Sequence, residues 1–580
     1  MTSLVPLGLR RSLGVTRFGS LFTKYHPFQQ SHLLLSPSNH ITTHSEEQNV
    51  LCGPPPISAM PQEDLHHLIF SRAVKWSHMD CFECSVSGKK YTYGEVMDRA
   101  LRWGGILSRV AASSSRDVKK VGFFCTNAPE FPIILLGSLA YGSCFVTFSS
   151  NYTVDEVARQ ITDSEVDVFV TDSGLEKVLE DALNKTGKKL PVFVNGNSAY
   201  GHPNLCQLIE DPARPFIDPV KVPVESAATI LYSSGTTGKP KGVVMSHKAF
   251  TANLASFTHP DFYDIPPYSG GQQDVVLGVL PFYHIYGLYV TSLLNLYNGV
   301  KIVSFPSFQP EDFLRVLRDQ QVRVLHLVPP MLNFLVKSPI VTSRDLASVE
   351  GVMVAAAPVP ISSAKRFKEK APKKVKFQEG FGMTETLGTH MTPLNDERLG
   401  YCGKTVVGVK AKVVNEAGEA LPEGERGELC LKTPSLMTSY YNNPETTKDS
   451  IDGDGWFHTG DVAIHQDGFF SIVDRIKELI KVKGLQVSPS ELEDLLLKHP
   501  GVGEVGVVGV ADERSGELPR AYVVKKDKST TEEDLHQFLS SKVSGYKQLK
   551  GGIRFMDGLP KNATGKLLRK DLKEIAAKDP

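Results

Sequence analysis

The fold of this chain is decided by residues 119–165, which read KKVGFFCTNAPEFPIILLGSLAYGSCFVTFSSNYTVDEVARQITDSE. Two apolar runs in it, residues 119–127 and 144–150, have the length and the β-branched and aromatic content of buried strands. Each run is followed by a segment with a helical pattern, residues 128–142 and 153–165. Strands that alternate with helices are typical of parallel sheets covered by helices. The sequence therefore predicts an α/β fold.

The same alternation extends over most of the chain, and we expect residues 61–474 to form one large domain of helix-covered sheets. Beyond about residue 400 the sequence changes to short β segments with glycine turns, which predicts a small antiparallel β subdomain. Residues 475–580 contain further helices and strands and are expected to form a small α+β C-terminal domain, with the boundary at Asp474 and Arg475.

One helix start in the C-terminal domain is well specified. Residues 488–491, Ser-Pro-Ser-Glu, supply a capping serine, a proline in the first turn and the acid of a capping box. Residues 498–500, Lys-His-Pro, mark the end of the same helix.

Composition excludes several classes of protein. Of the 580 residues, 41% are apolar and 22% are charged, as in ordinary globular domains, and 64 basic residues balance 64 acidic ones. We therefore expect no nucleic-acid partner. Eight cysteines without paired spacings suit a reducing compartment. The uncharged runs 131–154 and 283–300 contain Pro, Gly, Ser or Asn and read as a buried helix leading into a strand, so no transmembrane segment is predicted.

Residues 1–60 are set apart as an N-terminal targeting or disordered segment. Four basic residues, Arg10, Arg11, Arg17 and Lys24, precede the first acid, Glu46, and serines are interspersed with apolar residues. This composition is typical of a mitochondrial transit peptide. A disordered tail on a cytoplasmic or peroxisomal protein is the alternative.

A phosphate-binding loop is predicted at residues 233–242, SSGTTGKPKG, directly after an apolar strand. A Walker loop is excluded, because only two residues separate Gly235 from Gly238 and proline follows Lys239 where Ser or Thr would hold magnesium. Hydroxyl donors, close backbone approach and lysines still suit nucleotide phosphates, and a generic Ser/Gly turn would not explain the lysines. The predicted phosphate ligands are Ser233, Ser234, Gly235, Thr236, Thr237, Gly238 and Lys239.

With its flanks, this loop (YSSGTTGKPKGVVMSH) resembles the signature of the adenylate-forming, AMP-binding enzymes: acyl-CoA synthetases, 4-coumarate:CoA ligases, luciferases and adenylation domains. Five further segments follow in the order typical of that family, and the resemblance covers roughly residues 62–575, nearest to the coumarate ligase and luciferase branch. They are LPFYHIYGL (280–288), EGFGMTET (379–386), GWFHTGD (455–461), DRIKELIKVKGLQVSPSELE (474–493) and LPKNATGKLLRK (559–570).

The resemblance implies a reaction in two steps, in which a carboxylate and ATP give an acyl-adenylate and pyrophosphate, and coenzyme A then takes the acyl group. It implies that Thr384 contacts the α-phosphate and that Glu385 holds Mg²⁺. The glycine-bounded segment Gly380, Phe381 and Gly382 would border the adenine, although a tight turn also explains its glycines. Glu379 stands where coumarate ligases have Gln.

Four more residues gain roles from the resemblance. Asp461 would take both ribose hydroxyls, with ordinary turn capping as the alternative, and Arg475 and Lys477 would add nucleotide contacts. His284 resembles the histidine that borders the acyl carboxylate; a lone histidine in an apolar stretch is otherwise a core residue.

The resemblance also implies that the C-terminal domain is mobile, because in that family the same small domain takes part in both steps of the reaction. Lys566 matches the lysine that reaches the attacking carboxylate and ATP during adenylation. Lys481 and Gln486 match nucleotide-facing positions, and Lys483 and Gly484 match positions that face coenzyme A. Ser307 replaces a lysine that coumarate ligases use toward coenzyme A.

The leading hypothesis is an ATP-dependent acid:CoA ligase that acts on a small carboxylic acid. Thr386 and Leu387 replace the small Ala-Gly pair typical of coumarate ligases, and we predict an acyl pocket with His284, Ala357 and Thr386 for medium-chain, branched or aromatic acids. A luciferase-like monooxygenase and an enzyme that loads a carrier protein are the alternatives.

Overall fold

A computed structural model describes residues 49–57, 59–233, 240–483, 485–512, 514–540, 542–562 and 565–578. Most of the predicted targeting segment and most of the predicted phosphate loop, Ser234–Lys239, lie outside these residues.

The predicted alternation of strands and helices is confirmed. Within residues 119–165 the structure has β4 (Lys120–Phe124), α4 (Phe131–Tyr141), β5 (Cys144–Thr147) and α5 (Val154–Ser164), and β4 and β5 pair in parallel. Thr153 begins α5 with a capping box: its side chain accepts from the backbone N–H of Glu156, whose carboxylate accepts in return.

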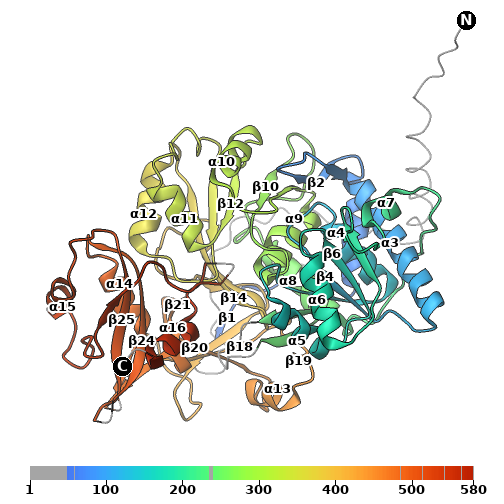
Figure 1. Ribbon diagram of the computed structural model, residues 1–580. Coiled ribbons are helices and arrows are strands. Elements are labelled where there is room, and N and C mark those ends of the chain that lie inside the picture. Colours follow the sequence, from blue (N-terminus) through green and yellow to red (C-terminus); the bar gives the residue numbers. More distant parts are fainter. Residues whose placement is uncertain are drawn as a thin grey trace, which may run out of the picture.

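These strands belong to a seven-stranded sheet whose neighbouring strands are parallel except for the antiparallel pairs β8–β9 and β9–β19 (Figure 1). Its other strands are β6 (Val168–Asp172), β7 (Val192–Asn195), β8 (Ala227–Ser233), β9 (Lys241–Ser246) and β19 (Ser439–Tyr440), in the spatial order β19-β9-β8-β5-β4-β6-β7. The associated helices are α3 (Tyr93–Ser114), α6 (Glu176–Thr186), α7 (Leu205–Glu210) and α8 (His247–Phe257).

Two further sheets complete the large domain. One has the order β10-β11-β2-β3, with β2 (Asp80–Cys84), β3 (Lys90–Thr92), β10 (Val275–Gly278) and β11 (Lys301–Ser304). The other has the order β12-β13-β14-β15-β16, with β12 (Val324–Leu327), β13 (Gly351–Val354), β14 (Lys376–Met383), β15 (Leu387–Met391) and β16 (Lys404–Thr405). Their helices are α2 (Leu65–Ala73), η1 (Val74–Trp76), the π-helix η2 (Tyr286–Leu293), α9 (Leu294–Asn298), α10 (Pro310–Asp319), α11 (Pro329–Lys337) and α12 (Ile361–Lys370).

The uncharged runs lie inside this domain: the first forms buried α4 and β5, and the second forms η2 and α9 before β11. Among the described residues, no helix is both long and apolar enough to cross a bilayer. All eight cysteines are described, and each is a free thiol.

The predicted β subdomain is an antiparallel sheet with the order β1-β17-β18-β20-β21. Its strands are β1 (Leu51–Cys52), β17 (Lys410–Val414), β18 (Gly427–Lys432), β20 (Phe457–Gln466) and β21 (Phe469–Arg475), and α13 (Pro444–Ser450) lies beside it. Strands β20 and β21 form a hairpin in which Asp461 lies opposite Arg475. The predicted boundary at Asp474 thus coincides with the last residues of β21.

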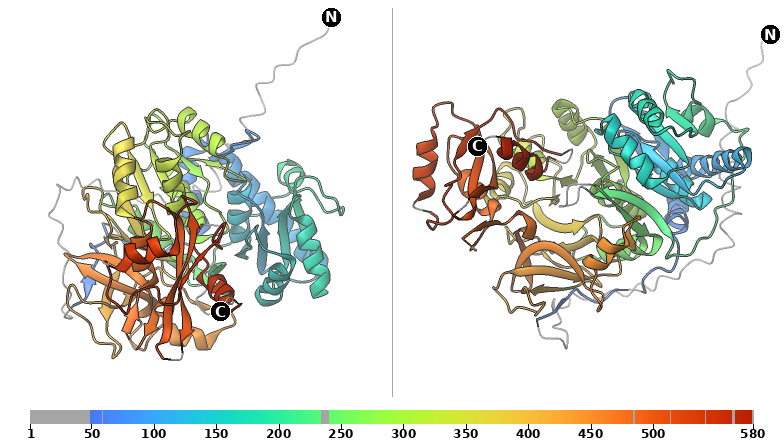
Figure 2. Two further views of the ribbon diagram at one scale, coloured as in Figure 1. Left: turned by 60° about the vertical axis from the view of Figure 1, so that its left-hand side comes forward. Right: turned by 60° about the horizontal axis from the view of Figure 1, so that its bottom comes forward.

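The C-terminal region forms a separate lobe beside the β subdomain (Figures 1 and 2). A sheet of the order β23-β22-β25-β24, with β26 paired to β25, packs on helices around a core of its own. Its elements are η3 (Ile476–Glu478), β22 (Ile480–Val482), β23 (Leu485–Val487), α14 (Pro489–Leu496), β24 (Val502–Asp512), β25 (Gly516–Lys525), α15 (Glu532–Ser540), β26 (Ile553–Phe555) and α16 (Arg569–Lys578). The expected α/β class with a small α+β C-terminal part is confirmed.

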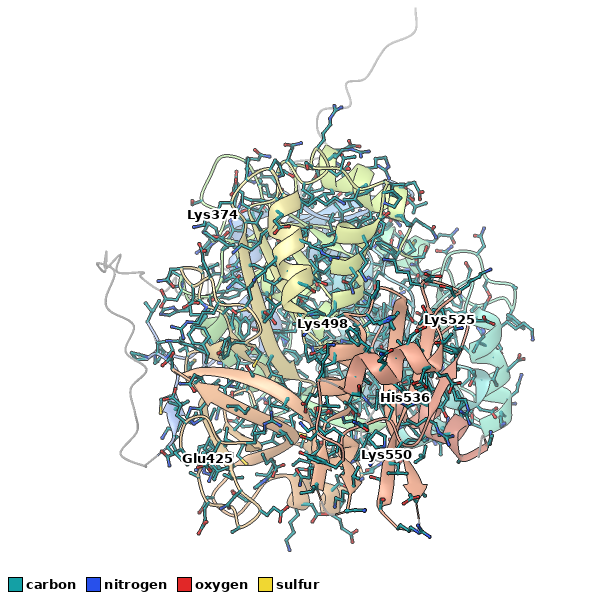
Figure 3. All side chains as sticks on the ribbon, turned by 90° about the vertical axis from the view of Figure 1, so that its left-hand side faces the viewer. Lys374, Glu425, Lys498, Lys525, His536 and Lys550 are labelled. Atoms are coloured by element: carbon teal, nitrogen blue, oxygen red, sulfur yellow. The ribbon has the colours of Figure 1, made fainter. Side chains whose placement is uncertain are left out.

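Charged side chains of both signs are spread over the face drawn in Figure 3, where Lys374, Glu425, Lys498 and Lys550 are exposed. This mixture agrees with a chain whose basic and acidic residues balance.

Candidate active site

A cavity of about 660 Å³ opens where the large domain meets the C-terminal lobe. It is lined by residues that are far apart in the sequence, from Thr147 at the end of β5 to Arg569 at the start of α16. The predicted site residues on its wall are Ser233, His284, Ala357, Glu379, Gly380, Phe381, Gly382, Thr384, Glu385, Asp461, Arg475 and Lys566. Their roles stay predictions, but the fold brings them to one place.

Strand β14 supplies one wall of the cavity. It pairs antiparallel with β15, and the register shifts between Phe381 and Gly382. A Cβ added to Gly382 would lie 2.3 Å from the carbonyl oxygen of Leu387, so only glycine fits there. This close approach explains one glycine of the motif without any ligand, while Phe381, Thr384 and Glu385 still line the cavity.

Asp461 and Arg475 form a buried pair on the β20–β21 hairpin. The Nε atom of Arg475 lies 3.0 Å from Oδ1 of Asp461, whose side chain is 4% exposed. The other carboxylate oxygen, Oδ2, is buried and has no hydrogen-bond partner among the described residues. Burial raises the pKa of Asp461, and the charge of Arg475 opposes this rise. A buried acceptor without a donor on the wall of a cavity is suited to a ligand hydroxyl.

Lys566 reaches the same cavity from a tight turn of the C-terminal lobe. The backbone N–H of Lys566 donates to Oδ1 of Asn562 at 2.8 Å, and the N–H of Asn562 donates to the carbonyl of Lys566 at 2.9 Å. Gly565 has φ 77°, and a Cβ there would lie 2.6 Å from Pro330 of the large domain, so a side chain fits neither the conformation nor the contact. Burial, followed by repulsion from Arg475, lowers the pKa of Lys566.

His284 lines the cavity just before η2. The backbone N–H of Tyr286 donates to its Nδ1 at 3.2 Å, so the proton of the neutral ring lies on Nε2. Burial, and to a lesser extent the charge of Lys566, lowers the pKa of His284 to about 4. The ring is therefore neutral near pH 7 and offers one N–H donor.

Glu379 of β14 and Glu385, which follows this strand, lie in different environments. Oε1 of Glu379 accepts from the N–H of Gly400 at 2.8 Å, and burial raises the pKa of this carboxyl to about 7. Oε1 of Glu385 accepts from the hydroxyl of Tyr440 at 3.0 Å and from that of Ser233 at 3.4 Å. Glu385 thus connects the β14 segment to the strand that precedes the predicted phosphate loop, and its carboxylate is the kind of oxygen donor that Mg²⁺ prefers.

The structure places another group of predicted ligands outside the cavity. Lys481, Lys483 and Gln486 are exposed on the β22–β23 hairpin, while Lys566 from the same lobe is in the cavity. Lys477 is also exposed, but its charge contributes, after burial, to the lowered pKa of Lys241 near the end of the predicted phosphate loop. Gly484, like Ser234–Lys239, lies outside the described residues.

The prediction of Thr386 as a pocket residue is corrected. Its side chain is completely buried, its hydroxyl donates to the carbonyl of Leu387 at 3.1 Å, and it is not part of the cavity wall. Leu387 and Gly388 line the cavity instead. Leu387 has φ 58°, a left-handed conformation that is unfavourable for leucine and that glycine adopts readily.

Sequence reasoning also missed Arg569 and Glu478 on the cavity wall. Arg569 is 11% exposed and pairs with Glu478 at 3.2 Å and with Glu493 at 2.5 Å. The TGKLLRK segment is rich in basic residues, which indicates that a cation could reach the site. Its sequence did not distinguish Arg569 from lysines on the surface.

Comparison with known proteins agrees with this architecture. A family model described as AMP-binding enzyme matches residues 70–441, and a model of the AMP-binding enzyme C-terminal domain matches residues 491–566. Among curated relatives, the probable 4-coumarate–CoA ligase 1 of Dictyostelium discoideum is 36% identical over 496 residues, which cover 81% of this chain and 88% of that protein. The 4-coumarate–CoA ligase 1 of Petroselinum crispum is 33% identical over 535 residues, covering 89% and 94%.

Solved structures give the same result. ATP-bound MatB from Rhodopseudomonas palustris superimposes with a TM-score of 0.79 at 28% identity, covering 89% of this chain and 99% of that chain. MenE from Bacillus subtilis, in complex with the acyl-adenylate intermediate OSB-AMP, has a TM-score of 0.75 at 26% identity, covering 87% and 97%. The chain therefore belongs to the family of AMP-binding enzymes, and the two curated relatives named above are a probable 4-coumarate–CoA ligase and a 4-coumarate–CoA ligase. The predicted resemblance is confirmed.

Proposed function

We propose that this protein is an ATP-dependent, AMP-forming acid:CoA ligase that joins a hydrophobic carboxylic acid to coenzyme A through an acyl-adenylate. The observation that carries the proposal is the buried Oδ2 of Asp461, which has no hydrogen-bond partner in the described part of the chain, in a cavity that also contains Arg475 and Lys566. A buried acceptor and two cations beside an apolar part of the cavity suit a nucleotide next to an acyl chain.

The first step requires positive charge where negative charge gathers on phosphoryl and carboxylate oxygens. Lys566 would donate to the attacking carboxylate and to the α-phosphate, and Nε2–H of His284 would orient that carboxylate. Asp461 would accept from the ribose hydroxyls. Glu385 would hold Mg²⁺, which neutralises phosphate charge when bound.

The second step requires a different arrangement of the C-terminal lobe. Lys566 lies in the cavity while Lys483, which matches a position that faces coenzyme A, is exposed, and this supports a state suited to adenylation. We propose that the lobe rotates near Asp474 and brings Lys483 and Gly484 toward coenzyme A.

The acyl group is proposed to be a medium-chain, branched or aromatic acid. Phe257, Tyr286, Tyr289, Met353 and Leu387 give one part of the cavity an apolar wall. Because Leu387 occupies a left-handed position, Leu387→Gly relieves strain and also enlarges this part.

Pyrophosphate release, measured with Mg²⁺, ATP and a panel of carboxylic acids, with and without coenzyme A, tests the function. We expect acid-dependent release and multiple turnovers with formation of acyl-CoA only when coenzyme A is present. Absence of release with every acid overturns the proposal, and light emission or acyl transfer only to a carrier protein would assign another second step.

The same panel tests the acyl pocket with Leu387→Gly and with Thr386→Ala as the matched control. We expect Leu387→Gly to raise kcat/KM for bulky acids relative to small ones about tenfold, because one added hydrocarbon group changes discrimination by at least this factor. The Thr386→Ala variant should keep the original order of preference, since Thr386 does not line the cavity.

Mitochondrial delivery is proposed from the composition of the first 45 residues, in which four basic residues precede any acid. Fusion of residues 1–60 to a fluorescent protein, with Arg10 and Arg11 changed to Glu as the control, tests this directly. A fusion that stays in the cytoplasm or enters peroxisomes would overturn it.

A further inference from the structure

A group of metal-ligating side chains lies on the β subdomain, apart from the cavity. Cys430 of β18 lies directly opposite His458 of β20, and the register of the two strands shifts between Glu428 and Cys430. Such a bulge re-aims side chains. As a result, Nδ1 of His458 lies 2.8 Å from Oε2 of Glu428 and 3.5 Å from Sγ of Cys430.

We propose that Glu428, Cys430 and His458 bind a divalent cation of the zinc class, with water completing the coordination. Sulfur, imidazole nitrogen and carboxylate oxygen are the donors that Zn²⁺ takes in proteins. With zinc distances of about 2.3 Å to sulfur and about 2.0 Å to nitrogen, a tetrahedral centre separates these two atoms by about 3.6 Å. The structure has 3.5 Å between them.

A second layer of contacts holds these donors in place. Nε2 of His458 lies 3.6 Å from Oδ2 of Asp452, and Oε1 of Glu428 accepts from the N–H of Gly460 at 3.0 Å. Oδ1 of Asp452 accepts from two backbone N–H groups in its own loop, at 3.0 and 2.8 Å. Histidine ligands of metals typically donate their other N–H to a carboxylate, and Asp452 is placed for that purpose.

Binding of the metal ion releases one proton from this site. The thiol of Cys430 releases its proton to solvent as the S–metal bond forms. The ring of His458 becomes the tautomer with Nε2–H, which faces Asp452, and its Nδ1 lone pair turns to the ion. The distance from Nδ1 to Glu428 must then widen by about 0.5 Å, because a tetrahedral centre needs about 3.3 Å between nitrogen and oxygen.

Burial and charge around the group decide how the ion would enter. Cys430 is fully buried, and burial raises the pKa of its thiol to about 12 against the charge of Lys412. His458 and Glu428 are 32% and 21% exposed, so the site is open to solvent on one side. An exposed His–Glu pair alone contributes little to stability. The buried thiol at ligand distance is what distinguishes this group from such a pair.

Titration of the full-length protein with Co²⁺, without ATP or acid, tests the site because a thiolate bound to Co²⁺ absorbs in the near ultraviolet. We expect this band to saturate at one equivalent, to be reversed by Zn²⁺, and to be absent from Cys430→Ser. The control Cys206→Ser removes a half-buried thiol elsewhere and should keep the band.

Two further variants separate a metal site from a reactive thiol. His458→Gln should weaken Zn²⁺ binding, and Asp452→Asn should weaken it 10- to 100-fold through the lost second-layer contact. Circular dichroism establishes that each variant is folded. Lack of the band in the wild-type chain, or its persistence in Cys430→Ser, overturns the proposal; neither result bears on pyrophosphate release.

Discussion

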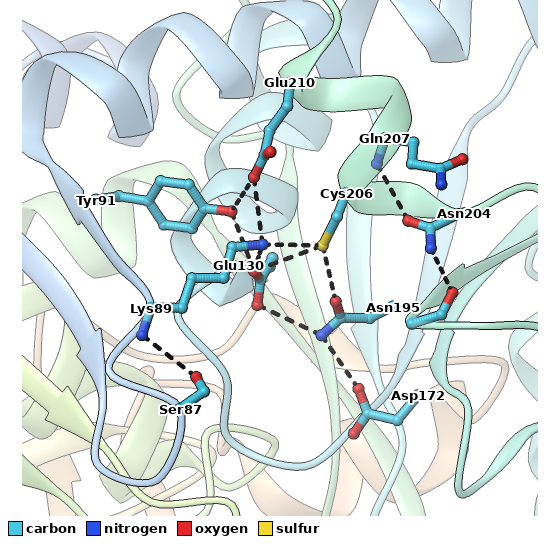
Figure 4. Close-up of polar contacts among 11 residues, drawn as sticks. Ser87, Lys89, Tyr91, Glu130, Asp172, Asn195, Asn204, Cys206, Gln207 and Glu210 are labelled. Carbon is cyan, nitrogen blue, oxygen red and sulfur yellow. Dashed lines mark hydrogen bonds and ion pairs between the residues drawn. The ribbon is translucent and has the colours of Figure 1, made fainter.

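Two clusters of charged side chains in this protein differ in how completely their charged groups are paired. In the large domain, the ammonium group of Lys89 lies 2.9 Å from Glu130, 3.2 Å from Glu210 and 3.2 Å from Sγ of Cys206 (Figure 4). The hydroxyl of Tyr91 lies within 3.1 Å of both carboxylates. In the cavity, by contrast, Oδ2 of Asp461 has no partner among the described residues.

From this difference we expect the paired Lys89 cluster to contribute to stability and the open acceptor of Asp461 to contribute to function. Every charge of the Lys89 cluster has a partner, and its buried member is Glu130, which is 5% exposed beside the 35% exposed Lys89; disrupting this pair should cost stability. A buried acceptor left open costs stability in the free protein and is compensated when a ligand binds. Substitutions in the Lys89 cluster should therefore alter unfolding, and substitutions in the cavity should alter catalysis.

The largest expected effect is that of Lys566→Ala. Loss of one preorganised donor should slow acyl-adenylate formation by about 10² to 10³, with no loss of thermal stability. Pyrophosphate release measures this step, and thiolation of a supplied acyl-adenylate should survive. Equal loss of both steps would contradict the assigned role.

Asp461→Asn should have the next largest effect. A hydrogen bond to a charged group contributes about 1.5–3 kcal/mol, so KM for ATP should rise about 10- to 100-fold. Steady-state kinetics at saturating acid measures the change, with the exposed Asp467→Asn as the control. An unchanged KM for ATP would remove Asp461 from the nucleotide site.

Glu130→Gln should lower the free energy of unfolding by about 2 kcal/mol, because Lys89 loses its closest carboxylate. Urea unfolding measures the loss, and activity per folded molecule should stay at the wild-type level. Glu225→Gln removes a carboxylate that is 70% exposed and should change neither quantity. Lost activity in folded Glu130→Gln would abolish the contrast between the clusters.

The smallest effect concerns Glu379, a buried carboxyl inside the cavity wall. Its pKa is raised from 4.5 to about 7 in the folded chain. Between these values the unfolded chain has lost the proton that the folded chain keeps, so wild-type stability should fall as pH rises from about 5 to 7. Glu379→Gln should lack this component, so its stability relative to wild type should increase between pH 5 and pH 8. Urea unfolding at pH 5 and pH 8 measures it, and equal pH dependence of both proteins would refute it.

Much of the fold could be predicted because it follows from local patterns. The alternation in residues 119–165 gave the parallel sheet, and Ser488 does cap α14, accepting from the N–H of Glu491 at 3.2 Å. Helix α14 ends at Leu496, just before the predicted stop at residues 498–500.

The remainder depends on tertiary geometry. Sequence spacing could not show that β20 and β21 align Asp461 with Arg475, nor that Thr386 turns away while Leu387 takes a left-handed conformation. It also could not show which side of the C-terminal lobe faces the cavity, because Lys566 and the Lys481–Gln486 hairpin both carry family motifs within the same lobe.

The π-helix η2 has an evolutionary consequence for the acyl pocket. Its wider turns accommodate one residue more than an α-helical turn does, and Tyr286 and Tyr289 on it line the cavity. A single-codon deletion within residues 286–293 would allow an ordinary α-helix and would re-aim the side chains within this segment, while the helix that follows keeps its direction. A lineage could thus present a different face to its substrate without exchanging a single amino acid.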